Sequence, residues 1–193
     1  MAGHARYTAL LDACVLFPIA TCNALMSVAS TRIFAAKWTA AIDDEWTRNL
    51  AAAKGIEVGK LATRRDLMHA ACLDWEVPRA AWEPLVPCIQ LPDVNDRHVL
   101  AAAIAGHADC IVTVNLKDFP AETLGPLGIE VLHPDAFLVA QIELAPLQVL
   151  PAFKAMRARH LNPVVTPGEF ADSLARSGLV RTADYLRQAA ELI

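Results

Sequence analysis

The sequence predicts an α/β fold in which a parallel sheet carries helices on both faces, followed by a small C-terminal helical extension. Short continuous apolar runs alternate with longer amphipathic segments, a pattern typical of buried parallel strands joined by helices. Hydrophobic residues make up 55% of the 193 residues, which excludes a disordered chain. Prolines (12) outnumber glycines (8), as suits short, stiff connections. These observations together favour one α/β domain with an appendage.

The apolar runs place the elements in order along the chain. We expect strands at residues 7–17, 85–90, 110–114 and 129–132. We expect helices at residues 21–29, 34–50, 58–75, 96–106 and 134–143, the first capped by Thr21 and the fourth closed by Gly106. Three short helices follow, at residues 151–160, 167–176 and 182–192. Because Pro146 and Pro151 interrupt the pattern, we divide the chain into a domain at 1–145 and a helical extension at 146–193.

Composition excludes several classes of protein. No apolar stretch approaches the roughly 20 residues of a membrane span, and no basic-then-apolar leader opens the chain. The five cysteines show no C-x-x-C spacing, which disfavours a zinc site and fits free thiols in a reducing compartment. A net charge of −4 argues against nucleic-acid binding by bulk charge alone. We therefore expect a cytoplasmic protein with no membrane partner.

One aspartate stands inside the first apolar run. A buried carboxylate such as that of Asp12 is costly unless it is paired or binds a metal. Glu45, Asp96 and Asp118 occupy the borders of later apolar runs. Sites of parallel sheets lie at the carboxyl ends of the strands, so we expect these acids to meet there. Four carboxylates suit a hard divalent cation, Mg²⁺ or Mn²⁺.

Each of three acids also has an ordinary structural interpretation. Asp96 could cap a helix, and Asp93 could do the same one turn earlier. Glu45 belongs to the run Asp43-Asp44-Glu45, and a charge run on a helix is usually a solvated face. Asp118 could be a turn aspartate. Their order and context, rather than any single position, favour a site.

Other conspicuous side chains are better explained by structure. We expect His98, two residues after Asp96, to point away from the site on its helix. The spacing of Trp38 and Trp46 indicates core packing rather than stacking on bases. Arg64 and Arg65 are expected on a solvated helix face.

At this point the sequence resembles a known family. The segments LLDACVLFP, WTAAIDDEWTRNL, LPDVNDRHVLAAAIAGHADCIVTVNLKDFP and GIEVLHPDAFL together resemble a PIN domain, more narrowly the VapC-type toxins with a short C-terminal helical extension. The resemblance covers roughly residues 7–143. It implies a three-layer α/β/α sandwich and Mg²⁺- or Mn²⁺-dependent ribonuclease activity. It also implies an RNA substrate, a cognate antitoxin protein and a homodimer.

The resemblance assigns roles residue by residue. The acidic cluster of the family corresponds to Asp12, Glu45, Asp96 and Asp118, with Asp93 as an additional metal ligand. Thr113 and Asn115 match the polar pair that lines the family's site, and Arg97 and Lys117 flank the acids, where they could reach a phosphate. Two positions depart from the family pattern: Cys14 replaces a common asparagine, and Cys22-Asn23 stands where relatives carry Arg-Asp.

The sequence thus favours a metal-dependent endoribonuclease that hydrolyses RNA as the toxin of a type II toxin–antitoxin system. The first alternative is a catalytically weak PIN module that serves as an RNA- or protein-binding scaffold, against which the intact acid set argues. The second is an aspartyl phosphatase of the haloacid dehalogenase type. That chemistry needs a second aspartate two residues after the first, where this chain has Cys14.

Overall fold

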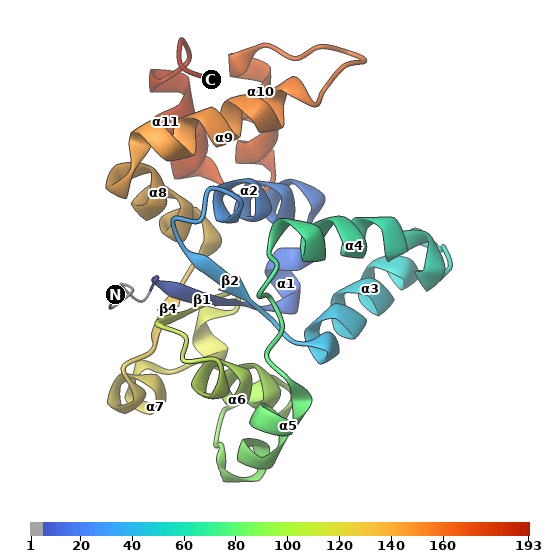
Figure 1. The fold of residues 1–193 in the computed structure, drawn as a ribbon, viewed down its shortest axis with the longest axis vertical. Coiled ribbons are helices and arrows are strands. Elements are labelled where there is room, and N and C mark those ends of the chain that lie inside the picture. The colour runs from blue at the N-terminus through green and yellow to red at the C-terminus, as the bar shows by residue number, and fades with distance from the viewer. Residues whose placement is uncertain (1–5) are drawn as a thin grey trace.

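The computed structural model describes residues 6–193, along which strands and helices alternate before a run of helices ends the chain (Figure 1). The strands are β1 (Thr8–Leu11), β2 (Ala35–Lys37), β3 (Cys110–Val112) and β4 (Glu130–Leu132). The α-helices are α1 (Ala13–Leu16), α2 (Ile19–Ala29), α3 (Ala40–Lys54), α4 (Ala62–Ala71), α5 (Arg79–Trp82), α6 (Arg97–Ala105), α7 (Ala121–Leu124), α8 (Pro134–Leu144), α9 (Pro146–Ala158), α10 (Pro167–Arg176) and α11 (Val180–Gln188). Short 3₁₀ turns are η1 (Val58–Leu61), η2 (Glu83–Cys88), η3 (Val94–Asp96), η4 (Leu116–Asp118) and η5 (Gly125–Leu127).

The four strands form one parallel sheet in the order β2-β1-β3-β4. In β1, Ala9 lies opposite Ala36 on one side and Cys110 on the other. All residues of β3 are buried, which explains its continuous apolar run. Because every strand points the same way, the carboxyl ends of all four meet at one edge of the sheet. This edge is where the predicted acids should gather.

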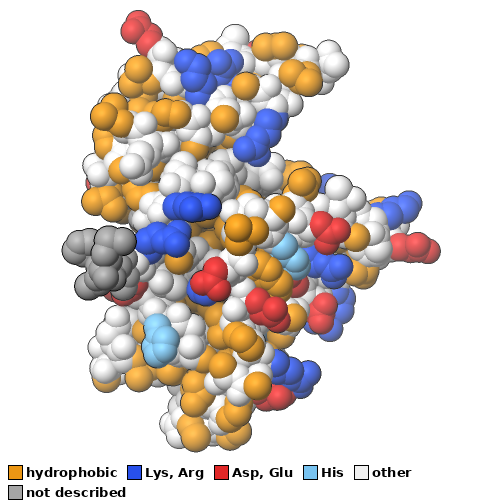
Figure 2. Space-filling view, in the orientation of Figure 1, with side chains coloured by type: hydrophobic (Ala, Val, Ile, Leu, Met, Phe, Trp, Pro, Cys, Tyr) orange, Lys and Arg blue, Asp and Glu red, His pale blue; other side chains and the backbone are white. Residues whose placement is uncertain are grey.

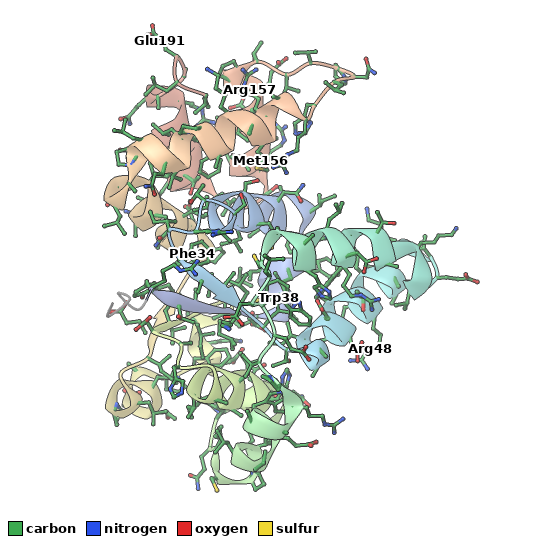
Figure 3. All side chains as sticks on the ribbon, in the orientation of Figure 1. Phe34, Trp38, Arg48, Met156, Arg157 and Glu191 are labelled. Carbon is green, nitrogen blue, oxygen red and sulfur yellow. The ribbon has the colours of Figure 1, made fainter. Side chains whose placement is uncertain are left out.

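Helices cover both faces of the sheet, so the predicted α/β/α sandwich is confirmed. Helix α2 contacts β2 on one face, whereas α6 contacts β1 and β3 and α7 contacts β4. In Figure 1, α2 lies above the sheet and α6 and α7 lie below it. Phe34, labelled in Figure 3, packs edge-on against Phe137 with ring centroids 4.8 Å apart, which joins α8 to the α2 side.

The first predicted strand is wrong beyond Leu11. The chain turns at Asp12 and continues as the short helix α1. Both halves of the run 7–17 are largely buried, and a continuous apolar run cannot distinguish a buried strand from a buried helix. The next helix starts at Ile19, so Thr21 is buried within α2 instead of capping it.

Two further expectations about elements are wrong. Residues 34–50 were expected to form one helix, but they contain strand β2 and then α3, whose N-terminus Thr39 caps through its side chain. The two alanines of β2 are strong helix formers, so local propensity points away from a strand. Residues 85–90 were expected to form a strand, but they lie largely in η2. Pro84 and Pro87 lack the N–H donors that a central strand needs.

The C-terminal helices pack directly on the sandwich. Helix α9 contacts α2 and α11 contacts α8, and in Figure 1 these helices stack above α2. Helix α9 starts at Pro146 and continues through Pro151, which was expected to mark a boundary. Figure 2 shows the surface hollowed between the C-terminal helices and α4. The division at 145/146 stays a prediction.

The buried side of α8 joins the C-terminal helices to the sandwich. The carboxylate of Asp135, only 6% exposed, accepts hydrogen bonds from the backbone N–H groups of Arg181 and Thr182, both at 2.8 Å. The Thr182 hydroxyl donates a third bond at 2.7 Å. Asp135 therefore satisfies the otherwise unpaired N–H groups at the start of α11.

The large aromatic side chains belong to the core. Trp38 (labelled in Figure 3) and Trp46 are fully buried, so the prediction that they pack in the interior is confirmed. Among the helices of residues 6–193, none combines the length and the apolar character that crossing a membrane requires.

Candidate metal centre

Asp12 lies at the carboxyl end of the central strand. Its backbone N–H donates to the Val112 carbonyl at 3.2 Å, which extends the β1–β3 ladder by one step. Its side chain is 4% exposed, and its Oδ2 accepts from the Thr113 hydroxyl at 2.7 Å and from the Cys14 thiol at 3.0 Å. These contacts fix the carboxylate while providing no opposite charge.

Asp96 lies at the start of α6, and its side chain makes no capping hydrogen bond. Capping falls instead to Asp93, whose Oδ1 accepts from the Asn95 N–H at 2.8 Å at the start of η3. The structural interpretation of these two acids is therefore correct for Asp93 and wrong for Asp96. The Asp96 carboxylate is half-buried and free to face the neighbouring acids.

The predicted acids form one electrostatic group around Asp96. Burial raises the pKa of Asp96 to about 6, and the nearby carboxylates of Asp12, Asp93, Asp118 and Glu45 raise it in that order. Like charges this close disfavour ionisation of the carboxyl between them. The structure thus brings together all five acids that the sequence singled out, from the ends of β1 and η4, the start of α6, and α3.

Glu45 has a partner that sequence reasoning missed. Its Oε2 lies 3.5 Å from Nε2 of His98, one turn into α6. The expectation that His98 points away from the site is therefore wrong, because at the first turn of a helix the neighbouring α3 can be reached from this position. The His98 ring also packs beside Trp82, with centroids 6.2 Å apart. No sequence spacing links Glu45 to His98, since α3 and α6 are joined only by the tertiary fold.

The acidic group is open rather than a closed cage. Within residues 6–193, no three His, Cys, Asp or Glu side chains are arranged closely enough to hold an ion unaided. Magnesium does not need such a cage, because it keeps several waters and is often held by one or two carboxylates together with substrate phosphates. The raised pKa of Asp96 marks a surplus of negative charge that a cation would neutralise. The residues present therefore fit Mg²⁺ or Mn²⁺.

Cys14 and Thr113 form the lining directly behind Asp12. Thr113 is fully buried, and its hydroxyl also accepts from the Asn115 N–H at 3.0 Å. The Cys14 sulfur accepts from the Val114 N–H at 3.3 Å. Burial and the adjacent Asp12 raise the pKa of the Cys14 thiol to about 12, so it stays neutral. The cysteine that departs from the family pattern thus belongs to the site as a hydrogen-bond donor.

The remaining candidate residues lie around the acids with differing exposure. Asn115 and Lys117 are exposed beside Asp118, where a polymer substrate could contact them. Arg97 is half-buried, and its Nε has no hydrogen-bond partner among the described residues. These positions are open to a phosphate backbone, whereas Thr113 is not.

Two charged residues near the site were assigned wrongly to solvent. Asp43 is 3% exposed and accepts from the indole N–H groups of Trp38 (3.1 Å) and Trp46 (2.8 Å), while His69 Nε2 lies 2.7 Å from its second oxygen. Arg64 donates to the carbonyls of Leu16 and Phe17 at the end of α1 and lies over the Trp46 ring. The two tryptophans flanking Asp43 were the available signal, because buried indole N–H groups need acceptors.

Comparison with known proteins agrees with this geometry. A family model described as "PIN domain" matches residues 8–117, and one described as "VapC50 C-terminal domain" matches residues 134–188. A curated protein of Mycobacterium tuberculosis (strain ATCC 25618 / H37Rv), named "Putative ribonuclease VapC50", is 43% identical over 80 residues. That alignment covers 42% of this chain and 47% of the relative, so the chain spans about half of the relative's length. No solved structure gives a significant match. Because the PIN model spans more than half of the chain and the parallel sandwich agrees with it, the chain belongs to the PIN domain family and carries a VapC50-type C-terminal domain.

Proposed function

We propose that this protein is a metal-dependent endoribonuclease that hydrolyses RNA phosphodiester bonds. The observation that carries the proposal is the set of carboxylates around Asp96, which raise its pKa and have no cationic partner of comparable proximity except His98 beside Glu45. Membership of the PIN family and the ribonuclease named among its relatives support the same chemistry.

Under this proposal, Asp12, Asp96 and Asp118 hold one or two Mg²⁺ or Mn²⁺ ions, and Asp93 is a further ligand. A bound ion of this kind lowers the pKa of water and stabilises charge on phosphoryl oxygens. Glu45 ligates the ion or orients the attacking water, and the neighbouring His98 holds the Glu45 side chain in place. Thr113 positions Asp12 by its hydroxyl, which keeps one carboxylate oxygen fixed.

The basic and polar residues at the rim supply substrate contacts in this proposal. Arg97 and Lys117 neutralise phosphates next to the scissile bond, and Asn115 contacts the sugar–phosphate backbone. Such contacts position RNA without reading its sequence, so they set affinity rather than target choice.

The biological role proposed is that of the toxin of a type II toxin–antitoxin system in the cytoplasm. Its partners would be RNA, a cognate antitoxin protein and a second copy of the chain, with no membrane. Residues 1–145 are proposed as the nuclease domain and 146–193 as the helical extension. The match to a VapC50-type C-terminal domain supports this assignment to the VapC group.

The test is cleavage of a mixed RNA pool by the purified full-length chain, with Mg²⁺, with Mn²⁺, and with a chelator. We expect cuts at a few sites that require metal and that disappear in Asp96→Asn. Asp44→Asn, an exposed acid beside Glu45, is the matched control and should cleave as the unaltered protein does. Absence of cleavage by the folded, antitoxin-free protein in both ions would refute the nuclease and favour the scaffold interpretation.

A further inference from the structure

Four sulfur atoms meet between α2 and α4, away from the acidic site. Cys22 and Met26 are four residues apart on α2, and Met68 and Cys72 are four residues apart along α4 and its C-terminal end. Residues four apart lie on the same face of a helix, so each helix presents one thiol and one thioether to the other. The Cys22 thiol lies 3.6 Å from the Met68 sulfur, and the Cys72 thiol lies 3.9 Å from the Met26 sulfur.

These separations match those in a tetrahedral metal site. A metal–sulfur bond is about 2.3 Å long, so two sulfur ligands of a tetrahedral ion are about 3.8 Å apart. The two thiol–thioether distances bracket that value. Cys22 and Cys72 also lie close enough for the charge of one to raise the pKa of the other. All four sulfurs therefore surround a small common volume.

The surroundings suit a buried ion with a route from solvent. Cys22, Met26 and Met68 are buried, whereas Cys72 is half-buried and lines a cavity of about 510 Å³. The Arg64 guanidinium lies beside Cys22 and opposes the effect of burial on the pKa of that thiol. The buried Nε of Arg64 has no hydrogen-bond partner among the described residues, so it is available to a charged sulfur.

Ordinary core packing does not account for this pattern fully. Cysteine and methionine are common core residues, and S–H···S contacts alone would indicate only adaptable filling. Here the thiol–thioether pairing occurs twice in the same order along both helices, beside a cationic group and at the wall of a cavity. Packing requires none of these three features.

We propose that Cys22, Met26, Met68 and Cys72 form a binding site for one monovalent copper ion. Soft thiolate and thioether ligands select Cu(I), and thioethers are poor ligands for Zn²⁺, Mg²⁺ or Mn²⁺. Binding releases one proton from each thiol and leaves a net charge of about −1 on the ion and its four ligands, which Arg64 balances. The site is separate from the acidic group, and it does not depend on the nuclease activity proposed above.

The experiment is anaerobic titration of the reduced full-length chain with Cu(I) against a chromogenic Cu(I) chelator. We expect one tightly bound Cu(I) per chain and X-ray absorption showing four sulfur ligands at about 2.3 Å. The double substitution Cys22→Ser, Cys72→Ser should weaken binding about a hundredfold or more, and Met26→Leu, Met68→Leu about tenfold. Methionine-to-leucine changes conserve volume, and circular dichroism should show that this variant folds normally.

The control variant is Cys88→Ser, which alters an exposed cysteine and should bind Cu(I) unchanged. Unchanged affinity in the double cysteine variant would overturn the proposal. So would unchanged affinity in the folded methionine variant, or X-ray absorption with only two sulfur ligands. Equally tight Zn²⁺ binding that is lost in both double variants would contradict the assignment to copper.

Discussion

Two buried or half-buried aspartate sites in this protein are built in opposite ways. The Asp135 carboxylate accepts three hydrogen bonds from the start of α11, so its charge is fully solvated by the protein. The Asp96 carboxylate makes no capping bond and faces four other carboxylates, which raise its pKa to about 6. The same residue type therefore stabilises the fold at one place and is left electrostatically unfavourable at the other.

The difference distinguishes a structural carboxylate from one kept for a ligand. Asp43 belongs with Asp135, because two indole N–H groups and His69 surround it. Asp12 is intermediate, since Thr113 and Cys14 fix one of its oxygens without supplying positive charge. Burial alone does not separate these cases; the identity of the neighbours does.

The largest effect is expected for Asp12→Asn. An amide oxygen can still accept from Thr113, so the fold should be kept, but the ligand charge at the strand end is lost. We expect metal-dependent RNA cleavage to fall on the order of a thousandfold, measured as single-turnover rates. Asp44→Asn serves as the control. Cleavage within about tenfold of the unaltered protein would show that Asp12 is structural, as Asp135 is.

The next effect, on stability, is expected for Asp135→Ala. Removing this carboxylate leaves buried N–H groups at the start of α11 without an acceptor, so the free energy of unfolding should fall by about 3 kcal/mol. Urea denaturation measures this. Asp184→Ala, an exposed substitution in α11, should cost less than about 1 kcal/mol. Equal losses in the two variants would mean that Asp135 does not anchor the C-terminal helices.

A pH dependence should appear only at the acidic group. Because the pKa of Asp96 is about 6, protons compete with the cation below that pH. We expect the apparent affinity for Mn²⁺ to fall by about tenfold per pH unit below this value and to level off above it. Calorimetry across this range measures it, and an affinity that is constant down to about pH 5 would contradict the raised pKa.

The smallest effect is a stabilisation by Asp96→Asn in the absence of metal. The folded-state pKa is raised above 3.8, so ionisation is less favourable in the folded state than in the unfolded state. The free energy of unfolding therefore declines as pH rises from about 4 to about 6 and stays lower above that range. Near pH 8 the variant should be more stable by on the order of 1 kcal/mol, after discounting for solvent screening.

The sign of this change reverses with pH, which provides an internal control. Below about pH 4 the unaltered protein carries a neutral Asp96, so the two proteins should unfold at similar denaturant concentrations. A destabilised Asp96→Asn near pH 8 would place Asp96 with Asp135, as a carboxylate that the fold requires.

The sequence was sufficient to predict the acids and the family but not their partners. Asp12 in an apolar run and the motif around Asp96 are local signals, and both lead to the observed site. Contacts between distant elements left no such signal: His98 against Glu45, or Arg64 against the end of α1. Short element β2 was missed because neighbouring strands, rather than the propensity of its alanines, hold it extended.

Mn²⁺ binding measured by calorimetry tests most directly whether the unfavourable carboxylates are kept for a cation. The unaltered protein, Asp12→Asn, Asp96→Asn and the control Asp44→Asn would be titrated near pH 7.5, where Asp96 is ionised. We predict binding by the unaltered protein and by Asp44→Asn, and affinities lower by about tenfold or more in the other two variants. Absence of binding by the folded unaltered protein, or equal binding by all four, would contradict the account.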